Sequence, residues 1–250
     1  GSRELNLIAQ DTAYYGKDLK IKNGLASLIK KLDSIPDLHW LRLMYIYPER
    51  INDKLIERIV ESPKTLPYLD IPIQHVNSRI LKAMRRPDTS DSIHTLIEKL
   101  RESIDSLAIR TTVIVGFPGE TEQQFNELLD FIKWARFDAL GCFKYYPEAG
   151  TPAAEFPDQL PDDVKEQRFE QVMLAQQKIA FEKNHQKQGS EYEVLIDSVD
   201  ENDTAIGRND TQAPQIDSVC IIPDCPVSPG TLINAEVIDS QDYDIIMRKI

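Results

Sequence analysis

Runs of β-branched and aromatic residues alternate with stretches of helical periodicity along the first 150 residues. Five of these runs are typical of strands. The fourth ends in the unbroken β-branched series 111–115, as expected for a strand buried on both faces. The five runs are Glu4–Gln10, Trp40–Tyr47, Tyr68–Gln74, Ala108–Val115 and Ala139–Tyr146. Their repetition with helices between them predicts βαβ units and a parallel sheet, either as an α/β barrel or as an open α/β sheet.

Residues that start and stop helices support this pattern. Asn52 can cap the helix that follows it, and Thr121-x-x-Gln124 is a capping box ahead of another helix. A longer, mostly polar helix is predicted from Pro161 to Gln188, and Gly189 ends it. This helix marks the end of the α/β region.

After Gly189 the pattern changes to short alternating runs separated by turn residues. The runs are Tyr192–Val199, Thr204–Asn209, Val219–Ile222, Thr231–Ile238 and Tyr243–Met247. Alternation of this kind predicts a small antiparallel β-barrel. We therefore expect two domains, residues 1–188 and residues 189–250.

Charge is distributed unevenly between these two regions. The whole chain carries a net charge of -12, and residues 189–250 hold thirteen acidic against three basic residues, which leaves only -2 for the remainder. An acidic domain repels phosphate backbones and attracts basic partners, which argues against nucleic acid as a direct ligand. The candidate partner-binding residues are Asp197, Asp200, Glu201 and Asp203. A solvated acidic face is the alternative that remains open.

The remaining composition excludes several classes of protein. No run approaches 18 apolar residues and no basic-then-apolar leader opens the chain, so neither a membrane span nor a secretory signal is predicted. Three cysteines, Cys142, Cys220 and Cys225, are too few for a disulfide scaffold and suit the cytoplasm. They are also too scattered for a metal site, so plain thiols are favoured. Gly1-Ser2 is interpreted as a cloning remnant.

Candidate chemistry lies where the predicted strands end. The segment Ile114–Thr121 joins the fourth strand to a helix, and Gly116 with Pro118-Gly119 would let a flat ligand approach the backbone. An ordinary βα turn is the alternative. In α/β barrels the active-site residues gather at the carboxyl ends of the strands. The polar and glycine residues expected there are Gln10, Asp11, Gln74, His75, Gly116, Glu120 and Glu148.

Four blocks of sequence together resemble the radical SAM methylthiotransferases. They are Glu4–Thr12, Asp70–His75 with Met84–Arg86, Thr112–Thr121 and Phe143–Pro152. The terminal barrel is similar to a TRAM domain, which is OB-like. Gln10-Asp11-Thr12 and Gln74-His75 are similar to the RimO branch, whose members thiomethylate an aspartate of small ribosomal subunit protein twelve. Members of the tRNA-modifying MiaB branch usually differ at these positions.

The resemblance implies S-adenosylmethionine and two 4Fe-4S clusters in a full-length enzyme. Family members carry a C-x3-C-x2-C motif after the first barrel strand, and a further N-terminal domain whose three cysteines hold the second cluster. Neither is found in this sequence. The chain is therefore expected to be a C-terminal part, with a partial TIM-like radical SAM barrel that lacks its first strand and cluster loop. We expect it to hold no cluster and to be inactive alone.

The resemblance also implies roles for the strand-end residues. Ile114 and Gly116 would line the adenine of the cofactor. The residues expected to face its ribose, its carboxylate or the target are Gln10, Asp11, Gln74, His75, Arg85 and Arg86. No catalytic residue is assigned. Gln74-His75 as a satisfied polar strand end, and Arg85-Arg86 as a solvated pair, remain alternatives.

Three expectations concern the surroundings of the site. The aromatic residues Trp134, Tyr145 and Tyr146 are expected to pack in the core. The strand Glu4–Gln10 is expected to be an open sheet edge through which the chain self-associates. The predicted partner is a basic ribosomal protein of the small subunit. A tRNA substrate and a non-catalytic protein-binding module are the two competing functions.

Overall fold

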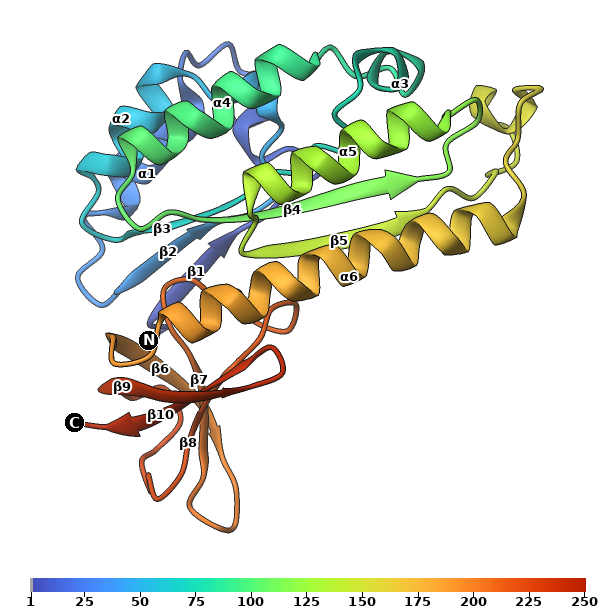
Figure 1. Cartoon of the computed structure of the whole chain (residues 1–250). Helices are drawn as coiled ribbons and strands as arrows, with labels where there is room; N and C mark the ends of the chain where they lie inside the picture. Colours follow the sequence, from blue (N-terminus) through green and yellow to red (C-terminus); the bar gives the residue numbers. More distant parts are fainter. Residues whose placement is uncertain (1) are drawn as a thin grey trace.

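Residues 2–250 are described by a computed structural model, and Gly1 of the expected cloning remnant lies outside them. Five parallel strands form a sheet in the order β1-β2-β3-β4-β5 (Figure 1). Their bounds are Glu4–Leu7, Trp40–Leu43, Thr65–Asp70, Ala108–Val115 and Ala139–Lys144. The predicted parallel α/β sheet is thus confirmed.

Helices cover one face of this sheet. Figure 1 shows α1, α2, α4 and α5 above the strands, while α6 runs along β5. The α-helices are α1 Gly24–Leu32, α2 Asp53–Glu61, α3 Ser78–Ala83, α4 Ser90–Ser103, α5 Glu122–Ala135 and α6 Asp162–Gln186. Short 3-10 turns are η1 Thr12–Tyr14, η2 Pro48–Arg50 and η3 Pro152–Glu155. No helix among the described residues has the length and hydropathy needed to cross a membrane.

The two faces of β4 differ, as the pleat requires. Ile109, Val113 and Val115 are buried in the core beneath the helices, whereas Arg110 and Ile114 alternate with them and are only half-buried. The second face of the sheet is therefore the one that remains available for the second domain and for ligands.

Local signals placed most helix starts correctly. The Asn52 side chain accepts a hydrogen bond from the backbone N–H of Leu55 at 3.0 Å, and Thr121 and Gln124 form the predicted capping box. The helix α3 was not predicted, although Asn77 caps it in the same way.

The first three strands end earlier than predicted. The run Tyr68–Gln74 was expected to be continuous, but β3 stops at Asp70. Pro72 has no amide hydrogen, so the ladder is interrupted there. Gln74, whose φ is +67°, rejoins β4 through an isolated bridge with Val113.

The second domain is a closed five-stranded barrel in the order β10-β8-β7-β6-β9. Its strands are β6 Glu191–Val199, β7 Ala205–Arg208, β8 Cys220–Ile222, β9 Leu232–Gln241 and β10 Asp244–Lys249. Four pairings are antiparallel as expected, but β8 and β10 are parallel. A ring with an odd number of strands cannot close with antiparallel pairs alone, which explains this exception.

The barrel packs beneath the sheet, where the strands begin. Trp40 and Ala108, the first residues of β2 and β4, form a shared apolar cluster with Leu195 and Ala213 of the second domain. Charged contacts surround this cluster, with Arg208 donating to Glu4 at 2.6 Å and Arg42 to the carbonyl of Asp210 at 2.8 Å. The carboxyl ends of the strands are left free by this docking.

The outer edge of β1 has no neighbouring strand among the described residues. Exposed apolar side chains lie near it, including Ile8 and Leu19. Self-association through this edge stays a prediction. Sedimentation of the chain as a monomer at high concentration would contradict it.

Candidate cofactor cavity at the carboxyl end of the sheet

A cavity of about 430 Å³ lies beyond the ends of β3 and β4. Its lining comes from the strand ends, from the end of α3 and from the segment after β5. The lining residues are Gln74, Ala83, Met84, Arg85, Arg86, Ile114, Phe117, Tyr145, Thr151, Pro152, Ala153 and Phe156. Four of the predicted cofactor-binding residues, Gln74, Arg85, Arg86 and Ile114, are thus brought together.

Backbone hydrogen bonds hold the floor of this cavity. The N–H of Gln74 donates to the carbonyl of Thr112 at 2.9 Å, and the N–H of Ile114 donates to the carbonyl of Gln74 at 2.7 Å. Both side chains are half-buried. A polar amide and an apolar side chain therefore stand next to each other at the cavity floor.

The two arginines differ in how firmly they are held. Arg86 donates from Nη2 to the carbonyl of Pro72, and its guanidinium lies 4.4 Å from the centre of the Tyr47 ring. Its Nη1 is buried without a hydrogen-bond partner, whereas Arg85 is exposed. Because a buried donor without a partner is costly, an acceptor on a ligand is the natural complement of Arg86.

Aromatic rings form a wall of the cavity. Phe117 meets Tyr145 edge-on at 5.1 Å between centroids and Phe156 at 6.2 Å. Apolar and aromatic walls with a few polar groups are typical of sites for flat heterocyclic ligands. The core packing predicted for Tyr146 and Trp134 was wrong, because these side chains are 77% and 42% exposed. Tyr146 follows β5, where the chain leaves the sheet, and the Trp134 ring of α5 lies against His94 of α4, 4.7 Å between centroids, at the protein surface.

His75 and Gly116 lie behind the cavity wall and not in its lining. The His75 side chain is fully buried, and Nε2 lies 3.1 Å from Oε1 of Glu120. The N–H of Gly116 donates to Oε2 of the same carboxylate, and Arg168 of α6 donates to it from Nη1 at 2.8 Å. Sequence reasoning missed Arg168, because it lies in a polar helix far from the strand-end motifs.

Gln10 and Asp11 lie elsewhere, at the end of β1. Asp11 pairs with Arg50, whose guanidinium also lies 5.0 Å from the centre of the Tyr14 ring. Asp11 and Tyr14 line a separate, mainly apolar cavity of about 600 Å³ between β1 and α1. Gln10 is exposed. The structure therefore does not bring these two residues together with Gln74 and Ile114.

A larger cavity, about 950 Å³, lies between the two domains. Some of its charged groups are matched with one another, because His39 pairs with Glu193 at 2.5 Å and Lys183 with Asp138 at 2.6 Å, whereas Asp210 keeps a buried oxygen without a hydrogen bond. None of the predicted site residues lines it. Size alone therefore does not make it the better candidate.

The four acidic residues proposed for partner binding belong to the β6–β7 hairpin, Asp197 to β6 and the other three to its turn. Asp197 accepts two hydrogen bonds from Arg208, at 2.7 and 2.9 Å, and Asp200 accepts from two backbone N–H groups of the turn. Glu201 and Asp203 are exposed, and no hydrogen bond or ion pair of their side chains is found within residues 2–250. Only these two are free for a partner without breaking a contact of the fold.

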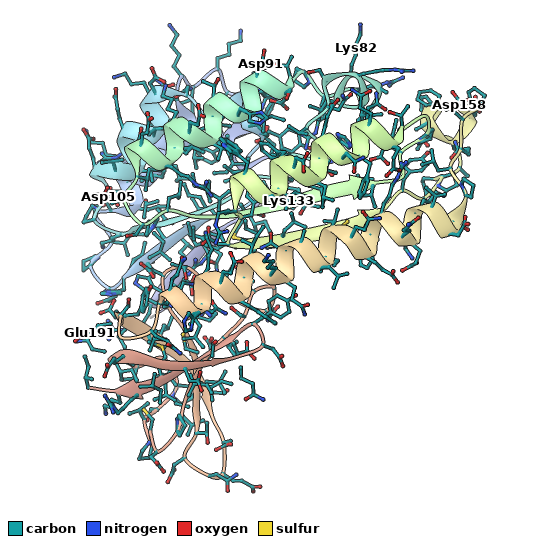
Figure 2. The ribbon with its side chains drawn as sticks, in the orientation of Figure 1. Lys82, Asp91, Asp105, Lys133, Asp158 and Glu191 are labelled. Atoms are coloured by element: carbon teal, nitrogen blue, oxygen red, sulfur yellow. The ribbon has the colours of Figure 1, made fainter. Side chains whose placement is uncertain are left out.

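The hairpin and the cavity belong to opposite ends of α6. In Figure 2, Asp158 lies shortly before the start of this helix and Glu191 shortly after its end. Its 25 residues span about 37 Å at the usual rise per residue. A partner that contacts both regions must therefore be large.

The cysteines do not form a cluster site. Cys142 lies in β5, while Cys220 and Cys225 are buried in the barrel. Burial raises the pKa of the Cys142 and Cys220 thiols to about 12. No three His, Cys, Asp or Glu side chains of the described residues gather in a geometry that could hold a metal ion. The residues present do not fit an iron–sulfur cluster.

Two family models match the chain and together cover most of its length. The Radical SAM superfamily model matches residues 7–132, and a TRAM domain model matches residues 189–250. The chain belongs to the radical SAM superfamily. The family resemblance seen in its sequence is confirmed.

Several methylthiotransferases are similar in sequence to nearly the whole of this radical SAM chain. The ribosomal protein uS12 methylthiotransferase RimO of Caldicellulosiruptor saccharolyticus is 42% identical over 98% of the chain, and that of Geobacter sulfurreducens is 44% identical over 98%. The chain spans only 56% of each of these proteins, about half of their length.

One solved structure supports the fold. Coproporphyrinogen III oxidase HemN from Escherichia coli, described as a radical SAM enzyme, superposes with a TM-score of 0.53 at 17% identity. The match covers 95% of this chain and 55% of HemN. At this identity the likeness concerns the fold alone.

Proposed function

We propose that this radical SAM chain is the cofactor- and substrate-binding part of a methylthiotransferase of the RimO type. The observation that carries the proposal is the cavity in which Gln74, Arg85, Arg86 and Ile114 meet. Relatives that are 41–44% identical are named ribosomal protein uS12 methylthiotransferases, which supports the same activity. The two 4Fe-4S clusters of the proposed enzyme would be held by residues other than those described.

The cavity fits S-adenosylmethionine in its chemistry. The ring wall of Phe117 and Phe156, with the Ile114 side chain, suits adenine. The unpartnered Nη1 of Arg86 suits a carboxylate or a hydroxyl oxygen. Gln74 would bind the ribose. When bound, S-adenosylmethionine would supply the radical chemistry and the methyl group of the reaction, while these residues bind and orient it.

The proposed substrate is an aspartate of ribosomal protein uS12, modified at its β-carbon. The net charge of -10 on residues 189–250 favours a basic protein over an RNA, because RNA binding depends on Lys and Arg side chains that contact phosphates. Glu201 and Asp203 are the proposed points of attraction. Such charges mainly raise the association rate and weaken with added salt.

Binding of the cofactor can be tested on this chain by calorimetry with S-adenosylmethionine. Ile114→Ala removes apolar contact from the cavity and should weaken binding about five- to tenfold. Thr112→Ala is the matched control, because Thr112 lies on the same face of β4 and outside the cavity lining. Equal effects of both variants would count against the assignment.

The substrate class can be tested with purified uS12 and tRNA over a salt series. Glu201→Lys with Asp203→Lys should weaken uS12 binding at low salt. Glu98→Lys with Asp105→Lys, the same change of charge at exposed sites of the first domain, should have a smaller effect. Tighter binding to tRNA, or no response to the hairpin variant, would favour the competing tRNA-modifying function.

A further inference from the structure

A fully buried carboxylate stands behind the cavity wall. Glu120 belongs to the loop between β4 and α5, and its side chain is 0% exposed. Its two oxygens meet groups from three different segments: His75 after β3, Gly116 after β4, and Arg168 on α6. Both oxygens have donors, so the charge is stabilised without solvent.

The hydrogen bonds of His75 define its tautomer. Its Nδ1 accepts from the backbone N–H groups of Val76 and Asn77, both at 2.9 Å. A nitrogen that accepts carries no proton, so Nε2 bears the hydrogen and donates it to Glu120. His75 therefore connects the chain after β3 to the carboxylate and presents neither nitrogen to the cavity.

Helix α6 holds the carboxylate from the other side. Arg168 is buried and donates from Nη1 both to the Glu120 side chain at 2.8 Å and to its backbone carbonyl at 3.0 Å. Lys165, one turn earlier, packs directly on Gly116, whose φ is +73°. A Cβ there would lie 2.4 Å from Cγ of Lys165. The position of α6 and that of Gly116 are thus coupled by charge and by packing.

The residues that Glu120 holds adjoin the cavity floor. His75 follows Gln74, and Gly116 lies two residues after Ile114; Gln74 and Ile114 are themselves joined by a backbone hydrogen bond of 2.7 Å. We infer that Glu120, with His75 and Arg168, is a positioning residue that sets the spacing of the two strand ends and so the affinity of the cavity. The inference depends on the proposed function only for the identity of the ligand.

Hydrogen exchange of backbone amides tests the positioning without any ligand. In Glu120→Gln, which keeps the shape of the side chain, the Gly116 and Ile114 amides should exchange about tenfold faster or more, as loss of a charged buried hydrogen bond implies. Arg168→Met should have the same effect. Arg168→Lys keeps the charge but loses the double contact, and should fall between wild type and Arg168→Met.

Lys183→Met is the control, because it removes another α6 ion pair, with Asp138, away from the cavity. It should lower the melting temperature but leave exchange at Gly116 and the affinity for S-adenosylmethionine within about twofold of wild type. Glu120→Gln should weaken that affinity about tenfold.

Unchanged exchange at Gly116 in Glu120→Gln, or an equal loss of affinity in Lys183→Met, would overturn the inference. If Arg168→Met does not fold, Glu120→Gln decides alone. If the wild type binds no S-adenosylmethionine while Gly116 responds as expected, the proposed cofactor is wrong and the positioning role stands.

Discussion

Buried charges occur at both ends of the sheet, and they are satisfied to different degrees. At the carboxyl end, both oxygens of Glu120 have hydrogen-bond donors. At the domain interface, Arg110 lies 3.3 Å from Asp217 and 3.9 Å from Asp70. One carboxylate oxygen of each aspartate has no hydrogen bond, whereas Nε lacks one in both Arg110 and Arg168, so the two ends differ in their carboxylates.

The difference indicates two uses of buried charge. A carboxylate whose two oxygens both accept hydrogen bonds fixes the positions of its donors. A set of loosely paired charges loses its hydration on burial but does not hold its members in one defined geometry. We therefore expect the Glu120 site to be intolerant of change. The interface should tolerate the loss of single charges, because its groups are redundant.

The largest effect is expected for Arg168→Met. Arg168 is the only cation that pairs with Glu120 among the described residues, so the variant leaves a buried charge without a counter-ion. The free energy of unfolding should fall by about 3–5 kcal/mol. Urea unfolding measures this, and a loss below about 1 kcal/mol would show that water or another group replaces the guanidinium.

A smaller effect is expected for Arg42→Met at the interface. Arg42 is as buried as Arg168 and donates to Glu4 at 2.8 Å, but Glu4 keeps a second cation, Arg208 at 2.6 Å. The loss should be about 1–3 kcal/mol, as for charged hydrogen bonds whose carboxylate keeps a counter-ion, although Oε1 of Glu4 and the carbonyl of Asp210 lose a donor. A loss equal to that of Arg168→Met would remove the proposed distinction between the two ends.

Local signals in the sequence predicted much of the fold. Capping residues such as Asn52 and Thr121 act within one turn, so their partners are close in sequence. The buried contacts of α6 could not be predicted, because Lys165 and Arg168 lie in a helix with polar residues on every side. Glu120 contacts a residue 48 positions away, and no periodicity in the sequence indicates such a pairing. The gathering of Gln74 and Ile114 was predictable, because both lie at the carboxyl ends of adjacent parallel strands.

A still smaller effect is expected for Tyr68→Phe. The Tyr68 hydroxyl donates to Oδ2 of Asp217 at 2.6 Å across the interface, and the same oxygen also accepts from the N–H of Ala213 at 2.9 Å. Since the oxygen keeps one donor, the variant should lose about 1 kcal/mol of unfolding free energy. A loss above about 3 kcal/mol in chemical denaturation would show that the interface is as strictly matched as the Glu120 site.

The smallest effect, with the opposite sign, is expected for Asp70→Asn. Burial raises the pKa of the Asp70 carboxyl above its ordinary value of 3.8, although Arg110 and the Tyr45 N–H oppose this and Asp217 adds to it. Between the ordinary and the raised pKa the native state binds more protons than the unfolded state, so stability falls as pH rises through this window. Asparagine carries no charge, and its amide oxygen can still accept from Tyr45. The variant should therefore be more stable than wild type at neutral pH, and the difference should vanish below pH 3.8. Asp105→Asn, at an exposed site, should show no such dependence. Urea unfolding of the three proteins over a pH series measures the difference. A variant less stable than wild type at pH 7 would mean that the attraction between Asp70 and Arg110 exceeds the desolvation cost of the Asp70 carboxylate. The charges of the interface would then stabilise the fold.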